Sequence, residues 1–225
     1  MDWGMFRAVS PLCEDFGNSR GKPLDRAYIE AFIERNSELI KGNVLEVLRD
    51  TYATRFGGTR VSGLEILNLT SDSREATIIA DLANCPEVPA ESFDCIILTQ
   101  TLQYIPDCAA AVGNVWRLLK PGGIALISVP MLSRLDAPPG GGYEDCWRFP
   151  PNGLRLLLSR YFPNSCISVE SHGNVQVALA YLMGLAREDL EQHEIDSNHW
   201  GFPVVVTATA MKPKSGALNS FGSLN

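Results

Sequence analysis

The sequence predicts one α/β domain in which a mostly parallel, seven-stranded sheet is flanked by helices. A chain of 225 residues, 45% hydrophobic and 20% charged, has room for one sizeable core and an ordinary globular composition. Several short runs are apolar almost throughout, which is typical of strands buried on both faces of a parallel sheet. Stretches with helical periodicity separate these runs, as expected when helices connect parallel strands.

The first part of the chain predicts an arm followed by a helix. Residues 1–22 contain Gly, Pro, Asn and Arg without periodicity, so we expect a flexible N-terminal arm. Pro23 suits the first turn of a helix, where its missing N–H has no partner to lose. The apolar residues that follow have roughly i, i+4 spacing, so this helix should pack on a core and end at Lys41-Gly42. The domain should span residues 23–212, and the tail, 213–225, should be disordered.

The rest of the chain follows the α/β pattern to its end. We expect further helices at residues 106–119, 152–161 and 175–185. We expect strands at residues 43–48, 60–68, 76–81, 93–99, 123–129, 167–171 and 203–210, with the last of them antiparallel.

A loop rich in Pro and Gly, Met131–Phe149, follows the fifth expected strand. It is longer than most connections in compact domains, and such loops are commonly functional. The loop starts at the edge of the sheet where ligands bind and ends in aromatic and charged residues. We interpret it as a lid over a bound substrate, with its hinge at Gly140–Gly142.

Charge and composition exclude several classes of partner. The formal net charge is −7, and no stripe of Lys and Arg is present, so a nucleic-acid partner is not expected. No apolar run is long enough to span a bilayer and no signal segment is recognisable, so we expect a cytoplasmic protein without a membrane partner. The six cysteines show neither a CxxC pair nor a nearby His at ligand spacing, so we expect free thiols and no metal site.

The polar residues at the carboxyl ends of the expected strands indicate where a ligand would bind. In an open parallel sheet, ligands occupy the crevice outside those ends. Carboxylates there can accept hydrogen bonds from ribose hydroxyls or read an adenine edge, and Ile66 and Leu82 can sandwich the ring. The glycine-rich turn GxGxxG is absent after the first strand, and the nearest glycines are Gly57 and Gly58. This absence disfavours ligands held by their phosphates, and an NAD-dependent oxidoreductase in particular.

Several segments together resemble class I S-adenosylmethionine-dependent methyltransferases, which have a Rossmann-like fold. The most specific is LLKPGG at Leu118–Gly123, preceded by SFDCIILTQTLQYI at Ser92–Ile105. Within the class, the chain is most similar to a bacterial branch whose first-strand motif lacks the usual glycines. Other matching segments are Arg20–Ile33, Gly42–Val47, Ala76–Leu82, Asp145–Phe149 and His172–Ala186.

The resemblance implies S-adenosylmethionine as the cofactor and assigns its binding residues by position. Leu48 stands where this branch usually has glycine. The ribose-binding acid maps to Glu65, with Asn68 and Asp72 as alternatives. The cofactor-binding residues that the resemblance implies are Glu46, Val47, Leu48, Glu65, Ile66, Asp81, Leu82, Thr99 and Gln100, with Thr101 beside them.

Two residues are candidates for catalysis, and two arginines for substrate or cofactor binding. Asp145 lies in the segment that ends the long loop, and His172 could act as a general base. The alternatives are structural: Asp145 could pair with Arg148 while Trp147 fills the core, and His172 could be an ordinary hydrogen-bonded side chain. Arg20 or Arg26 could clamp a carboxylate, and Asp25 could instead cap the first helix.

The expected activity is methyl transfer from S-adenosylmethionine to a small-molecule or sugar acceptor, at oxygen. Two alternatives remain open: a protein of the same fold that binds the cofactor without methyl transfer, and an enzyme that uses the cofactor in a different reaction.

Overall fold

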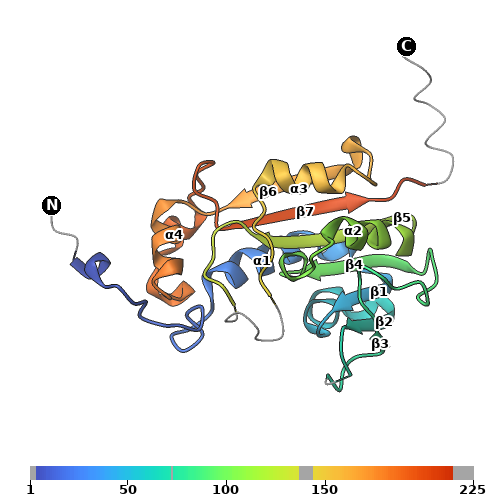
Figure 1. Cartoon of the computed structure of the whole chain (residues 1–225), viewed down its shortest axis with the longest axis horizontal. Coiled ribbons are helices and arrows are strands. Elements are labelled where there is room, and N and C mark those ends of the chain that lie inside the picture. The colour runs from blue at the N-terminus through green and yellow to red at the C-terminus, as the bar shows by residue number, and fades with distance from the viewer. Residues whose placement is uncertain (1–3, 72, 137–143, 215–225) are drawn as a thin grey trace, which may run out of the picture.

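The protein is a single α/β unit built on a seven-stranded sheet, as the sequence predicts (Figure 1). The computed structural model describes residues 4–71, 73–136 and 144–214. The sheet order is β3-β2-β1-β4-β5-β7-β6, and β7 is the antiparallel strand, paired with β5 and β6. The strands are β1 (Gly42–Val47), β2 (Val61–Asn68), β3 (Ile78–Ile79), β4 (Phe93–Thr99), β5 (Leu119–Pro130), β6 (Ile167–His172) and β7 (Val205–Met211).

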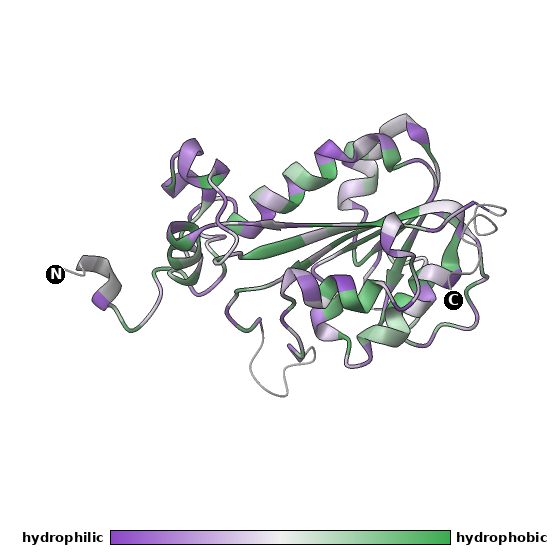
Figure 2. Ribbon diagram, turned by 90° about the horizontal axis from the view of Figure 1, so that it is seen from above, coloured by the Kyte–Doolittle hydropathy of each residue, from purple (hydrophilic) through white to green (hydrophobic). Residues whose placement is uncertain are grey.

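Helices cover both faces of the sheet and create two cores. Side chains of α1 (Leu24–Arg35) and α4 (Val175–Leu182) pack on one face, and those of α2 (Cys108–Leu118) and α3 (Pro151–Leu158) pack on the other. A short helix, α5 (Gln192–Asp196), follows α4. In Figure 2 the strands are largely hydrophobic along their length, whereas the helices alternate between hydrophobic and hydrophilic positions.

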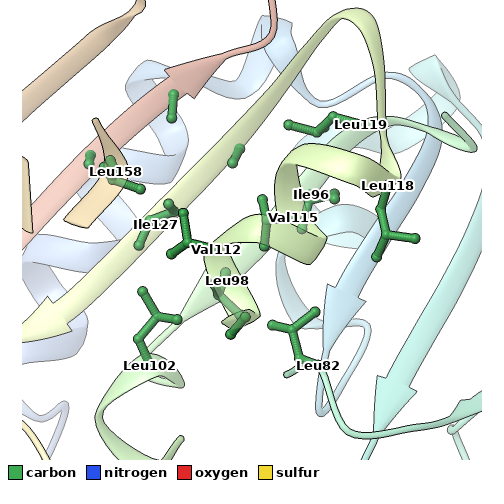
Figure 3. Close-up of a cluster of buried hydrophobic side chains, with 14 of the residues drawn as sticks. Leu82, Ile96, Leu98, Leu102, Val112, Val115, Leu118, Leu119, Ile127 and Leu158 are labelled. Carbon is green, nitrogen blue, oxygen red and sulfur yellow. The ribbon is translucent and has the colours of Figure 1, made fainter. Parts of the chain in front are cut away.

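The central strands divide their side chains between the two cores by simple alternation. Cys95 and Ile97 of β4 enter the core beneath α1, and Ile96 and Leu98 enter the core beneath α2. All four are fully buried. Figure 3 shows Val112, Val115 and Leu118 of α2 among the side chains of this second cluster. Burial on both faces explains why these strands are apolar almost throughout.

Some elements have other bounds than expected: β3 is shorter than residues 76–81, and β5 begins at Leu119, before residue 123. Two further differences are larger. The first helix ends at Arg35, not at Lys41-Gly42, because the side chain of Asn36 donates a hydrogen bond to the carbonyl of Phe32 at 2.8 Å and turns the chain. The expected alternation with helices also fails in the first half of the sheet. Only short helical turns, Ala53–Gly57 and Gly58–Arg60, connect β1 to β2, and residues 80–92 contain no helix.

Residues 80–92, which contain no helix, are held by two side chains of α2. Arg117 donates to the carbonyl oxygens of Cys85 and Val88, each over 2.7 Å, and Asn114 donates to that of Leu82 over 2.9 Å. These hydrogen bonds tie the backbone carbonyls of this segment to α2.

The described part of the N-terminal arm lies against the domain. The N–H of Leu12 donates to the carbonyl of Met183 just after α4, and Arg20 forms a bidentate ion pair with Asp189 at 2.7 and 2.9 Å. These contacts bring Asp15, Phe16 and Asn18 to the edge of the sheet. The expected disordered tail lies, from residue 215 onward, outside the described residues.

Candidate active site

Three pockets adjoin one another at the carboxyl edge of β1, β2, β3 and β4. The edge cleft, about 320 Å³, is lined by Arg26, Val47, Leu48, Leu67, Asn68, Leu69, Ala80, Asp81, Leu82, Gln100, Thr101, Tyr104, Ile105 and Asp136. The polar cavity, about 290 Å³, is lined by Asp15, Phe16, Asn18, Pro23, Asp25, Arg26, Gln100, Gln103, Tyr104, Pro130, Ser133, Arg134, Asp136, Asp145, Arg148 and Tyr181. The loop pocket, about 440 Å³, is lined by Arg26, Glu30, Glu46, Val47, Leu48, Arg49, Thr51, Tyr52, Thr99 and Gln100.

Glu46 organises the turn that follows β1. Its buried carboxylate accepts hydrogen bonds from the backbone N–H groups of Tyr52, at 2.9 Å, and Ala53, at 2.7 Å. Burial raises the pKa of Glu46 to about 7, although these two hydrogen bonds act in the opposite direction. Glu46 therefore lines the loop pocket and also fixes the backbone of Tyr52 and Ala53 beside it.

Leu48 has a backbone conformation that favours glycine. Its φ is 79°, in the left-handed region, and its N–H donates to the carbonyl of Leu67 over 3.0 Å. A non-glycine residue in this region costs roughly 1–2 kcal/mol. The chain therefore keeps the turn that the resemblance associates with glycine, and the leucine side chain, 40% exposed, becomes part of the cleft wall.

At β2, the structure places Asn68 in the edge cleft instead of Glu65. Glu65 is exposed and lines a separate pocket with Asn43 and Phe93, which belong to the opposite ends of β1 and β4. Asn68 is 6% exposed, ends β2, and accepts a hydrogen bond from the N–H of Leu69 over 3.0 Å. Of the three mappings for the ribose position, only Asn68 is seen in the cleft, since Asp72 lies outside the described residues.

Of the two residues expected to sandwich an adenine ring, only one lines the edge cleft. Leu82 lines the edge cleft, whereas Ile66 is buried within β2 and does not line it. Leu69, which the sequence argument did not select, stands in the wall beside Leu48. Asp81 is in the cleft as expected, and its Oδ1 accepts the N–H of Ala83 over 2.8 Å.

The segment after β4 joins the edge cleft to the polar cavity. Gln100 lines all three pockets and has a φ of 47°, a strained value that turns the chain outward from the strand. Its N–H is held by the carbonyl of Ser128 at 2.8 Å. Thr99 and Thr101 flank it, in the loop pocket and the edge cleft respectively.

Tyr104 and Asp136 are two further residues of this site, to which sequence reasoning gave no role. Both line the edge cleft and the polar cavity, and the Tyr104 hydroxyl donates to Oδ2 of Asp136 over 2.9 Å. Burial, and then this hydrogen bond, raise the pKa of Tyr104. Tyr104 stands in the matched segment Ser92–Ile105, which could have drawn attention to it, whereas nothing in the sequence distinguishes Asp136 from other loop aspartates.

The two arginines have different surroundings. Arg20 is committed to Asp189, so it anchors the arm. Arg26 lines all three pockets, and its Nη1 donates to the Tyr52 hydroxyl over 2.9 Å. The neighbouring Asp25 accepts the N–H of Arg26 over 2.8 Å, and burial raises the pKa of this carboxyl group.

Asp145 lies in the polar cavity, but its carboxylate is already engaged. Arg148 donates to both of its oxygens, at 2.8 and 3.1 Å, and the N–H of Asp136 donates to Oδ2 at 2.8 Å. Burial acts to raise the pKa of Asp145, but the hydrogen bonds from Arg148 and Asp136 outweigh it, so the pKa is lowered. The geometry therefore makes Asp145 an anchor for the loop and a poor proton acceptor.

The pairing of Asp145 with Arg148 agrees with the structural alternative, but Trp147 does not fill the core. Trp147 is 44% exposed and its indole N–H donates to the carbonyl of Ile105 over 3.0 Å. Phe149, 6% exposed, is the aromatic residue that enters the core. The proposed hinge at Gly140–Gly142 lies outside the described residues.

His172 lies outside the three pockets, which corrects its selection as a candidate base. It ends β6 at the far edge of the sheet, 6% exposed, with its ring 5.6 Å from that of Tyr28. Its Nε2 is 2.8 Å from the Thr207 hydroxyl, and burial lowers its pKa to about 4. The surroundings make His172 a packed, neutral side chain.

Other features of the chain bear on the kind of site. Among the described residues, no group of three or more His, Cys, Asp or Glu side chains is arranged to hold a metal ion. No helix in the described ranges is both long and apolar enough to cross a bilayer.

Comparison with known proteins finds a matching domain family and similar folds. Residues 41–127 match the family model described as a methyltransferase domain. A methyltransferase structure from Mesorhizobium loti, described as S-adenosylmethionine dependent, has a TM-score of 0.53 and 16% identity over 84% of this chain and 97% of its own. Phosphoethanolamine N-methyltransferase 2 of Haemonchus contortus, in complex with S-adenosyl-L-methionine, has a TM-score of 0.54 and 16% identity over 92% of this chain and 54% of its own.

The structure of the cyclase SpnF is also similar, with a TM-score of 0.55 and 17% identity over 92% of this chain and 89% of its own. No protein of curated function matches the sequence. These solved structures are similar to the chain in fold, and residues 41–127 match a methyltransferase domain.

Proposed function

We propose that this protein transfers the methyl group of S-adenosylmethionine to a hydroxyl of a small molecule or sugar. One observation carries the proposal: the edge cleft and the polar cavity share four residues, Arg26, Gln100, Tyr104 and Asp136. A cofactor in the cleft and an acceptor in the cavity would therefore meet at a common wall. Holding two reactants in contact at a fixed orientation supplies much of the rate enhancement in a displacement reaction.

The residues of the edge cleft fit the cofactor. Leu48, Leu69 and Leu82 offer apolar surfaces to an adenine ring, and the buried Asn68 amide can hydrogen-bond a ribose hydroxyl. Arg26 is the cation placed to bind the methionine carboxylate, since it reaches the cleft from α1 beside Gln100. When bound, S-adenosylmethionine supplies an activated methyl group on a sulfonium. We place the chain in the branch without the usual first-strand glycines because Leu48 occupies the left-handed turn.

Tyr104 and Asp136 support an oxygen acceptor. A hydroxyl must lose its proton as its oxygen bonds to the methyl carbon, so a base is needed within hydrogen-bonding reach. The Asp136 carboxylate is exposed, is part of the shared wall and is oriented by the Tyr104 hydroxyl at 2.9 Å. Asp136 therefore fits the role of proton acceptor better than Asp145 or His172.

A second candidate function rests on two observations. Leu48 intrudes where the resemblance places glycine, which favours a protein that binds the cofactor without methyl transfer. One structural neighbour is described as a cyclase, which favours the same fold with another reaction.

Calorimetry with S-adenosylmethionine, S-adenosylhomocysteine and NAD, followed by an assay for transfer of labelled methyl to a panel of sugars and small alcohols, separates the three functions. Methyl transfer supports the proposal, whereas tight binding of S-adenosylmethionine with no methylated product supports the alternatives. Binding of NAD in place of S-adenosylmethionine contradicts all three.

A further inference from the structure

Three buried side-chain atoms lack a hydrogen-bond partner among the described residues, and all three belong to the polar cavity. They are Nε2 of Gln100, Oε1 of Gln103 and Nε of Arg134. Buried polar atoms in native proteins are nearly always paired, so an unpaired atom needs an explanation. The gathering of these atoms around one cavity indicates hydrogen bonds that are made only when a ligand occupies it.

The two glutamines present one donor and one acceptor. Gln103 Nε2 donates to Gln100 Oε1 over 3.1 Å. Nε2 of Gln100 and Oε1 of Gln103 remain without a partner within the described part of the chain. Gln103 is 3% exposed, and its backbone carbonyl accepts the N–H of Cys146 over 2.7 Å, so the pair is held at the wall.

Arg134 adds a positive charge to the wall of the cavity. Its guanidinium lies 4.0 Å from the centre of the Phe16 ring, and Nη1 donates to the carbonyl of Leu135 over 2.6 Å. Arg148, in contrast, is paired with Asp145, whereas Arg134 belongs to no ion pair in the part of the chain that the structure describes. A guanidinium with unused donors is the side chain best matched to a planar, bidentate carboxylate.

The charge of the cavity as a whole selects the kind of anion. Its lining contains three arginines and four aspartates. Even with the buried Asp25 protonated, the other aspartates match the arginines in number, so a dianion such as a phosphate ester would find no surplus of positive charge, whereas a monoanion can pair with Arg134. The remaining unpaired oxygen, on the glutamine pair, requires a donor such as a hydroxyl.

We propose that the acceptor is a hydroxylated carboxylic acid of about monosaccharide size, such as a uronic or aldonic acid. Its carboxylate binds Arg134 and the amide donor of the glutamine pair, one hydroxyl donates to the amide oxygen of that pair, and another reaches Asp136. This assignment rests on the proposed methyltransferase function and names the chemistry of its acceptor. The cavity of about 290 Å³ is at the small end for a ligand site, which suits a molecule of this size.

The test is calorimetric titration of the protein loaded with S-adenosylhomocysteine. The probes are D-glucuronate, D-galacturonate, D-gluconate and D-glycerate, each compared with its primary amide, which has the same shape but no charge. We expect at least one acid to bind roughly tenfold or more tightly than its amide, the scale of one charge-assisted hydrogen bond. Arg134→Gln should remove this preference, and Gln103→Leu should weaken the acid and the amide alike.

The matched control is Arg160→Gln, which removes an exposed arginine that lines none of the pockets and should leave the preference unchanged. If Arg134→Gln does not fold, Arg134→Lys retains the charge without the planar fork and should reduce the preference. The inference is overturned if no acid binds more tightly than its amide, or if the preference survives in the Arg134 variant. Failure of S-adenosylhomocysteine to bind overturns the proposed function itself, whereas its binding without any acid preference overturns only the acceptor class.

Discussion

The Tyr104 hydroxyl donates a hydrogen bond to Oδ2 of Asp136 over 2.9 Å at the wall between the edge cleft and the polar cavity. The two residues are far apart in sequence, one after β4 and the other after β5, and the parallel sheet brings them together because both strands end at the same edge. This contact orients the carboxylate that we propose as the proton acceptor.

Replacing Asp136 by Asn should abolish most of the methyl transfer without loss of cofactor binding. The amide keeps the shape and can still accept the Tyr104 hydrogen bond, but it cannot take a proton, so we expect kcat to fall about 10²–10⁴-fold. Tyr104→Phe, which removes only the orienting hydrogen bond, should have a smaller effect. Initial rates and calorimetry with S-adenosylhomocysteine measure the two quantities. A variant with the activity of the native protein would remove Asp136 from the mechanism.

Asn68→Ala should weaken S-adenosylmethionine binding by roughly 1–3 kcal/mol, because a buried ribose hydroxyl would lose its partner. Glu65→Ala is the control on the same strand, and it should leave the affinity unchanged because Glu65 lies outside the edge cleft. Both affinities are measured by calorimetry. The reverse ranking would restore Glu65 as the ribose ligand.

The strain at Leu48 predicts opposite responses to two substitutions. Leu48→Val should destabilise the protein by about 1–2 kcal/mol, because a β-branched residue fits the left-handed region still less well. Leu48→Gly should not destabilise it, since relief of the strain offsets the greater freedom of glycine in the unfolded chain. Urea unfolding measures both free energies, and equal destabilisation by Val and Gly would show that the turn is unstrained.

The buried carboxyl of Glu46 should make stability fall as the pH rises. Its pKa is about 7 in the folded protein, against an ordinary value of 4.5, so between these two values the folded state binds more protons than the unfolded state. The free energy of unfolding should therefore decrease by up to about 3 kcal/mol from pH 4.5 to 7 and level off above. Glu46→Gln should flatten this dependence. Urea titrations at several pH values provide the measurement, and an unchanged slope in Glu46→Gln would assign it to another group.

Phe149→Ala should destabilise the protein much more than Trp147→Ala. Deleting the buried Phe149 ring costs about 3–5 kcal/mol, whereas Trp147 is 44% exposed and loses one hydrogen bond and part of its packing. Thermal melting of the two variants compares them directly. A larger loss of stability for Trp147→Ala than for Phe149→Ala would mean that the Trp147 ring covers the core in solution.

The sequence alone predicted the α/β class, the strand order along the chain and the antiparallel last strand. It could do so because a strand buried on both faces of the sheet, such as Phe93–Thr99, is apolar on both faces. This pattern can be read from the local sequence alone. The boundaries of the first helix and the missing helices between β1 and β4 were not predictable, because the side chains of Asn36, Asn114 and Arg117 decide them through contacts with other segments.

Some residues of the site could be placed from the sequence, and others only from the tertiary structure. The sequence placed Leu48, Asp81, Leu82 and Gln100 at the carboxyl edge, since a residue that ends a parallel strand must lie there. Only the tertiary structure places Asn68, and not Glu65, in the edge cleft: three residues along a strand amount to about 10 Å and the opposite face of the sheet. Only the tertiary structure, too, separated His172 from the pockets and joined Tyr104 to Asp136, because contacts between distant segments depend on how strands and loops pack, which no local pattern encodes.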